Sequence, residues 1–164
     1  MFFEPLRNLS NEIIQTDINK IVNSIIKNTD FNSFILDLNR IDQLFEQGIQ
    51  VDGSPVTSKG ANNGTYSKAS ETLSQGISFK YKSSSTKRKI AGEPFNFVNT
   101  GEWFDSFRLV IREDSFIIQA VNVHGIDMEA AYGQLLGLTD ESMQELINAI
   151  APILRQRLIN RLTR

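Results

Sequence analysis

The stretch that decides the fold is FVNTGEWFDSFRLVIREDSFIIQAV, residues 97–121. Its first half opens with Asn-Thr-Gly-Glu at residues 99–102, a pattern typical of a helix start, followed by aromatic residues at helical spacing. Its second half holds two apolar runs, residues 109–111 and 115–121, on either side of the polar pair Glu113-Asp114. Apolar runs around so short a polar turn predict a β-hairpin. The stretch therefore predicts a short helix followed by a short antiparallel sheet.

Helical patterns lie upstream of this stretch. Isoleucines at helical spacing within residues 14–26 predict one helix, and apolar residues within 31–45 predict a second. Residues 28–30, Asn-Thr-Asp, are expected to end the first helix and cap the second. Gly48 is expected to close the second helix as its C-cap.

Two further helices are predicted downstream. A short one is expected at residues 128–136, where Gly137 ends it, and a long one follows Thr139, its N-cap. Asp140 and Glu141 suit the positive end of the long helix dipole. Pro152 should kink this helix, because its nitrogen has no hydrogen to donate. The apolar residues of the long helix share one stripe: Met143, Leu146, Ile147, Ile150, Leu154, Leu158 and Leu162.

Two short motifs are expected to have structural roles. Thr100 and Gly101 form a tight helix cap, and the corner between the last two helices consists of Gly137, Leu138 and Thr139. The aromatic residues after the cap are expected to lock the short helix onto the sheet: Trp103, Phe104 and Phe107. The alternative role for Trp103 is that of an interface anchor.

Residues 53–92 differ from the rest of the chain in composition. They are rich in Gly, Ser, Asn, Thr and Lys, and their seven basic side chains stand against one acid, Glu71, which gives a net charge of +6. Only residues 77–82 alternate clearly enough to predict a strand. We expect a long basic loop, little of it held by a core, that becomes ordered against a neighbour. Its candidate interaction residues are Lys80, Lys82, Lys87, Arg88 and Lys89.

The other parts of the chain alternate in charge. Residues 1–52 carry a net charge of −4, residues 93–153 carry −8 and residues 154–164 carry +4. The whole chain of 164 residues has a net charge of −2, which argues against a polycation that coats nucleic acid. Blocks of opposite charge can pair head-to-tail between copies of one chain as readily as they bind a foreign polyanion. The alternative is that they are solvated faces and a mobile loop.

Catalytic chemistry has few candidates in this sequence. There is no cysteine, which excludes disulfides and thiolate ligands, and the single histidine is His124. Asp127 nearby suggests a base oriented by a carboxylate, but an ordinary loop histidine has the same pattern and is the interpretation we favour. Phosphate-cradle and nucleophile-elbow motifs are missing. We predict no catalytic, cofactor or metal residue and no small-molecule substrate.

The sequence predicts one domain that is not embedded in a membrane. No run approaches the roughly 20 apolar residues of a membrane helix, and the first residues lack the pattern of a secretory signal. The expected domain covers residues 1–164, with a helical part at 1–50, a basic extension at 53–92, and a short helix, hairpin and terminal helix at 93–164. Its 40% hydrophobic content is enough for one core.

Three segments resemble proteins of tailed phages. Residues 97–107, FVNTGEWFDSF, resemble the hydrophobic-x-Asp-Thr-Gly-x-Leu/Phe-x-x-Ser-Phe/Ile segment of neck and tail-completion proteins. Residues 136–142, LGLTDES, look like the Gly-Leu-Ser/Thr-Asp-Glu segment of virion-morphogenesis proteins. Residues 39–49, NRIDQLFEQGI, with Gly53 and Tyr66-Ser67 beyond them, resemble a pattern in related proteins of Bacteroidetes phages. The resemblance is to a subfamily, because the family has an aspartate at the position of Asn99 and an aliphatic residue at that of Trp103.

The resemblance implies both a fold and a role. The fold is α+β, with a small antiparallel sheet packed by the N-terminal and C-terminal helices and a long basic loop region. The role is that of a structural virion protein without enzymatic activity, a ring-forming head–tail connector or tail-completion (neck) component. The protein is expected in the host cytoplasm during assembly and at the head–tail junction of the virion. Its expected partners are further copies in the ring, the portal, adjacent neck or tail proteins and packaged DNA.

The alternative function is a nucleic-acid-binding module that uses the loop 80–89. Phe79 and Tyr81 lie between basic residues there, and single-stranded nucleic acid binds to aromatic side chains beside cations. Salt dependence separates the two functions, because binding to phosphates weakens steeply as salt rises.

Overall fold

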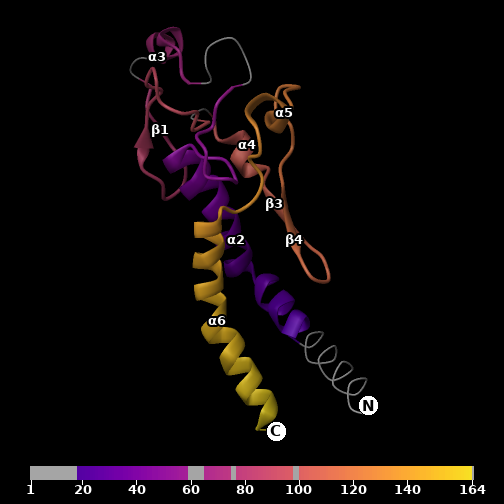
Figure 1. Ribbon diagram of the computed structural model, residues 1–164. Coiled ribbons are helices and arrows are strands. Elements are labelled where there is room, and N and C mark those ends of the chain that lie inside the picture. Colours follow the sequence, from indigo (N-terminus) through magenta and orange to yellow (C-terminus); the bar gives the residue numbers. More distant parts are fainter. Residues whose placement is uncertain (1–17, 59–64, 75–76, 98–99, 164) are drawn as a thin grey trace, which may run out of the picture.

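The computed structural model describes residues 18–58, 65–74, 77–97 and 100–163 (Figure 1). Over these residues the protein combines helices with two small antiparallel sheets of two strands each. This confirms the predicted α+β class. Within the described residues, no helix combines the length and the apolarity that crossing a membrane requires.

Residues 18–47 form a helical column. Residues 18–26 are helical, and helix α2 (Thr29–Asp37) continues directly into a π-helix, η1 (Leu38–Gln47). The predicted caps are confirmed: the Asn28 side chain accepts a hydrogen bond from the backbone of Asp30, and Gly48 ends η1 with a φ of 63°. The Gly48 N–H bonds to the carbonyl of Gln43, five residues back, as the wider turn of a π-helix requires. The helical periodicity did not predict this widening.

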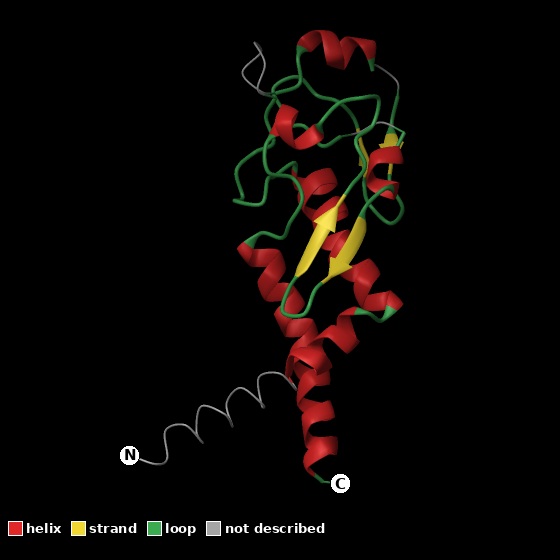
Figure 2. Ribbon diagram, turned by 90° about the vertical axis from the view of Figure 1, so that its right-hand side faces the viewer, coloured by secondary structure: helices red, strands yellow, loops and turns green. Residues whose placement is uncertain are grey.

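The stretch 97–121 forms the predicted helix and hairpin. Helix α4 (Glu102–Asp105) begins after Gly101, whose φ of 86° favours glycine. Strand β3 (Arg108–Ile111) pairs antiparallel with β4 (Phe116–Gln119), so that Leu109 lies opposite Ile118. Figure 2 shows this hairpin lying along the helical column. Trp103, Phe104 and Phe107 are all buried, which confirms their place in the core.

The basic extension at residues 53–92 is more structured than expected. It contains helix α3 (Lys68–Leu73) and a second hairpin, in which β1 (Phe79–Lys80) pairs with β2 (Thr86–Lys87). The expectation that little of it is held by a core is wrong for the residues that it buries: Val56, Tyr66, Tyr81 and Ser84. The tyrosines enter the interior because each phenol hydroxyl finds a partner there, Asn96 for Tyr66 and Asp105 for Tyr81.

The C-terminal part differs from the prediction in two ways. Helix α5 (Met128–Tyr132) ends at Gly133 rather than at Gly137, because Gly133 has a φ of 105°, outside the helical region. A side chain at this position would meet that of Gln50, so glycine fits there. Helix α6 (Asp140–Leu162) buries Leu146 and Ile150 only, among the residues of the predicted stripe whose side chains are described. Met143 and Ile147 are exposed, so the stripe is not one continuous core face.

The start of helix α6 and the proline inside it agree with the sequence. The Thr139 hydroxyl accepts a hydrogen bond from the Ser142 N–H and so caps its start. Pro152 lies inside the helix, and Figure 1 shows the helix axis changing direction along its length. The end of α6 and the start of the helix at residues 18–26 lie at one end of the molecule, and α3 lies at the other (Figure 1).

Candidate interaction sites

Two buried amide side chains of η1 hold the corner that follows α5. The Asn39 amide donates to the carbonyls of Leu135 (2.9 Å) and Gly137 (2.7 Å). The Gln43 side chain donates to the Gly137 carbonyl (3.1 Å) and accepts from the Thr139 N–H (3.0 Å). Both amides are fully buried. The structure thus confirms a corner at Gly137, Leu138 and Thr139.

Sequence reasoning missed the role of these amides. The available signal was their position, since Asn39 and Gln43 are four residues apart and follow a run of apolar residues at helical spacing. Polar side chains on a buried face need hydrogen-bond partners, and exposed backbone carbonyls at a corner provide them. The same reasoning applies to Arg40, which is buried beside them.

Arg40 joins η1 to helix α4. Its Nε lies 2.7 Å from the Asp37 carboxylate, and its Nη1 donates to the Phe104 carbonyl at 3.3 Å. Its guanidinium also lies 5.8 Å from the centre of the Tyr81 ring. With a carboxylate, a carbonyl and an aromatic face around it, this buried arginine has its partners within the chain, so it belongs to the core rather than to a binding site.

The five predicted basic residues lie on and beside the β1–β2 hairpin, but they do not form one free patch. Lys80, Lys82 and Arg88 are exposed. Lys87 is half-buried and forms an ion pair with Glu46 at 3.0 Å. Lys87 of the predicted basic run 87–89 therefore has a partner for its charge within the chain, and its contact with another molecule stays a prediction.

Glu46 anchors the hairpin to η1. Partial burial acts to raise the pKa of Glu46, but hydrogen bonds from the Ser85 side chain and backbone and from Lys87 lower it below its ordinary value. The carboxylate is therefore held in its charged form against the hairpin.

Tyr81 does not serve as a base-stacking platform. The residue is buried, its hydroxyl donates to the Asp105 carboxylate at 2.7 Å, and its ring packs 5.1 Å from that of Phe104. Burial and the bond to Asp105 raise the pKa of Tyr81. Stacking of single-stranded nucleic acid needs an aromatic face open to solvent. Of the two aromatic residues in the predicted nucleic-acid motif, Tyr81 is thus part of the core, and Phe79 is partly buried against it.

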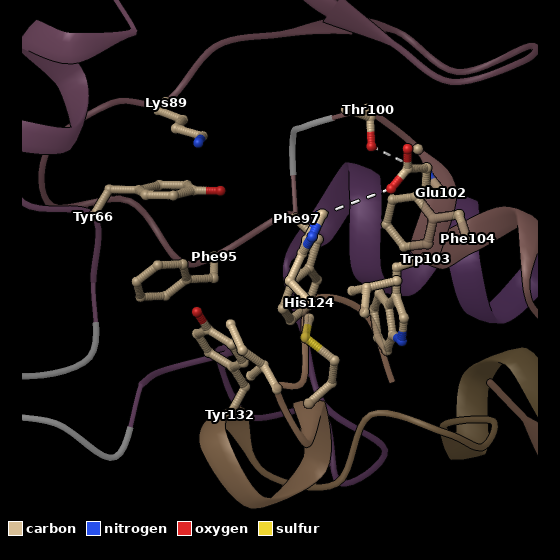
Figure 3. A pocket seen from close by; sticks show the side chains of 14 residues that line it. Tyr66, Lys89, Phe95, Phe97, Thr100, Glu102, Trp103, Phe104, His124 and Tyr132 are labelled. Carbon is tan, nitrogen blue, oxygen red and sulfur yellow. Dashed lines mark hydrogen bonds and ion pairs between the residues drawn. The ribbon is translucent and has the colours of Figure 1, made fainter. Parts of the chain in front are cut away.

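Lys89 instead borders a pocket with aromatic walls (Figure 3). The pocket holds about 200 Å³, and the Lys89 ammonium lies 6.0 Å from the centre of the Tyr66 ring. Tyr66 packs on Phe95, which packs on Tyr132, with ring centres 4.5 and 5.1 Å apart. The structure brings five of the predicted residues together around this pocket: Lys89, Thr100, Gly101, Trp103 and Phe104. Phe107 packs against Trp103, and the corner at 137–139 lies elsewhere.

His124 lies at the edge of this pocket without the partner that the sequence suggested. Its Nε2 is 3.8 Å from a Glu102 carboxylate oxygen (Figure 3), whereas the Asp127 carboxylate caps α5 through the Ala130 N–H. The histidine is well exposed. Among the described residues that line the pocket, Thr100 has the one serine or threonine hydroxyl, and it accepts a hydrogen bond from the Glu102 N–H. Over the described residues, no group of three or more acidic or histidine side chains is arranged to hold a metal ion.

Comparison with known proteins assigns this chain to no family. No protein-family model, curated protein or solved structure matches the chain significantly.

Proposed function

We propose that this protein is a structural component of a tailed-phage virion without enzymatic activity, a ring-forming head–tail connector or tail-completion (neck) subunit that joins the portal to the tail. Its partners are further copies of itself, the portal and adjacent neck or tail proteins, with packaged DNA passing nearby. It acts at the head–tail junction after assembly in the host cytoplasm.

The observation that carries this proposal is where the three phage-like segments lie. Residues 39–49, 97–107 and 136–142 are far apart in the sequence, but buried hydrogen bonds join them into one unit. Arg40 of the first segment binds the Phe104 carbonyl of the second, and Gln43 of the first binds Thr139 of the third. The three resemblances therefore fall on one folded unit rather than on separate parts of the protein, which supports reading them together.

The nucleic-acid alternative has less support. It requires aromatic faces between the basic residues of the loop 80–89, and Tyr81 is buried. The exposed side chains of Lys80, Lys82 and Arg88 still permit contacts to phosphates. Such contacts involve no base stacking, and their strength depends steeply on the salt concentration.

The test is deletion of the gene from the phage that encodes it. We expect filled heads and free tails that do not join, and joining restored by the wild-type gene supplied from a plasmid. An antibody against the protein should label the head–tail junction of intact particles. Normal joined particles from the deletion strain, or label confined to another part of the virion, would overturn the proposal.

A further inference from the structure

We propose that the exposed basic face of the β1–β2 hairpin of one copy binds an acidic-rimmed apolar groove on a second copy of this chain. The inference rests on the proposed ring function and identifies the two surfaces that form the contact between neighbouring subunits.

The groove lies between the helix at residues 18–26, the β3–β4 hairpin and the start of α6. It holds about 580 Å³. Asn23 fixes one side of it, because its amide donates to the carbonyls of Arg112 (3.0 Å) and Glu113 (2.8 Å) in the hairpin turn. The groove is therefore formed before any partner arrives. Its apolar lining includes Val22, Ile26, Phe116, Leu138 and Met143.

The rim of this groove is acidic. Glu113 and Asp114 are both exposed at the turn between β3 and β4. Two cations lie beside them, Arg112 next to Glu113 in the chain and Lys20 on the neighbouring helix, and no ion pair within the described residues joins either cation to these carboxylates. The apolar surface continues along α6, where Met143 is 37% and Ile147 50% exposed. An apolar floor with an acidic edge favours a partner that is both apolar and basic.

The β1–β2 hairpin has that chemistry. Lys80, Lys82 and Arg88 are exposed on it, and the exposed side chains of Ile77 (48%) and Ile90 (50%) flank it. Lys87 and Ser85 anchor the hairpin to Glu46, while Arg88 donates a hydrogen bond to Ser78 and the Lys82 ammonium lies 5.1 Å from the centre of the Tyr81 ring. The anchors to Glu46 remain in place when the exposed cations bind a neighbour.

The positions of the two surfaces favour a second copy as the partner. Figure 1 shows β1 on one side of the helical column and the β3–β4 hairpin on the opposite side. Complementary surfaces on opposite sides of one subunit make a head-to-tail contact, which closes into a ring when the rotation between subunits permits. Residues 53–92 and 93–153, with net charges of +6 and −8, contribute the two surfaces in the main.

Cysteine trapping tests this contact directly, because the chain contains no cysteine of its own. Full-length Lys80→Cys protein is mixed with tagged Asp114→Cys protein and oxidised, and disulfide-linked mixed dimers are measured. In the control mixture, tagged Arg155→Cys protein replaces the Asp114→Cys protein. Arg155 is exposed and lies outside both surfaces. We expect a several-fold higher yield from the 80–114 pair. Equal yields from the two mixtures would overturn the proposal, even if self-association in solution is too weak to detect.

Charge reversal provides an independent arm. Lys82→Glu/Arg88→Glu, added to the Lys80→Cys protein, and Glu113→Lys, added to the Asp114→Cys protein, should each reduce trapping several-fold, and the two reversals combined in one mixture should restore it. Arg108→Glu/Arg155→Glu changes the charge equally and should leave the yield unchanged. Loss of trapping in this control as well, or no recovery in the combined reversal, would overturn the contact. The ring is examined separately in virions. A neck ring that forms without this disulfide would refute the proposed contact but not the proposed function.

Discussion

The Gln43 side chain forms two of the hydrogen bonds that join the N-terminal helices to the C-terminal half. Gln43→Ala removes both, and leaves the Thr139 N–H and one bond of the Gly137 carbonyl without a partner in the interior. Each buried group left unpaired costs about 1–3 kcal/mol, so we expect a loss of roughly 2–4 kcal/mol in the free energy of unfolding. Urea denaturation measures it. Gln144→Ala, an exposed amide on α6, is the matched control and should change stability little.

Glu46 and Asp42 lie one turn apart on η1 and should respond to neutralisation in opposite directions. The pKa of Glu46 is lowered from its ordinary value of 4.5, so its charge stabilises the fold at pH values above 4.5. This stabilisation disappears as the pH falls through the lowered pKa. Partial desolvation, followed by the carboxylates of Glu145, Asp37 and Glu46, raises the pKa of Asp42, although its side chain is exposed. An acid with a raised pKa destabilises the fold while it is charged, and this penalty disappears as the pH falls.

At pH 7 we therefore expect Glu46→Gln to lower the urea midpoint and Asp42→Asn to raise it. Both differences from the wild type should shrink between pH 6 and pH 3, as the native carboxyl groups take up protons. Midpoints measured across this range check the signs. A destabilised Asp42→Asn at pH 7 would show that its carboxylate has a favourable partner that outweighs the repulsion.

At the scale of elements, α6 is a core helix over its first turns and a projecting one beyond them. Leu146 is buried, and Leu154 is only partly so. Leu146→Ala should cost about 2–5 kcal/mol, as for a fully buried leucine, and Leu154→Ala clearly less. Thermal or urea unfolding of the two variants compares them on one helix. Equal losses would mean that the second half of α6 is as tightly packed as the first.

Periodicity and capping chemistry predicted most of these elements, because they depend on neighbours in the sequence. The caps at Asn28, Gly48 and Thr139 and the β3–β4 hairpin are local features and were found. The exposed side of α6 was not, since apolar spacing shows that residues share a stripe but not how far a partner element extends over it. The π-helix was also missed, because its widening places Asn39 and Gln43 toward a corner some 95 residues further along the chain.

The candidate sites were predictable only in part for the same reason. Sequence identified the basic residues of the hairpin, and three of them are exposed as a binding role requires. It could not show that Glu46, about 40 residues upstream, binds Lys87, or that Tyr81 is buried against Phe104. The acidic-rimmed apolar groove likewise combines residues from four separate segments, and no local pattern in the sequence indicates that these segments meet.

For the whole molecule, the hairpin cations offer a way to distinguish a neck component that binds protein from a nucleic-acid-binding module in the assembling phage. Replacing Lys80, Lys82 and Arg88 with Ser removes three exposed charges but leaves the Lys87–Glu46 ion pair in place, so the fold should keep its stability. If the hairpin meets an acidic protein surface, we expect filled heads that no longer attach tails. If it meets DNA passing through the ring, tails should attach normally, and salt-sensitive binding to DNA fragments should be lost instead.

Electron microscopy of lysates and filter binding at two salt concentrations distinguish these results. The Arg108→Ser/Arg155→Ser variant serves as the control, and joined, infectious particles from both variants with DNA binding unchanged would show that the hairpin charges serve neither contact.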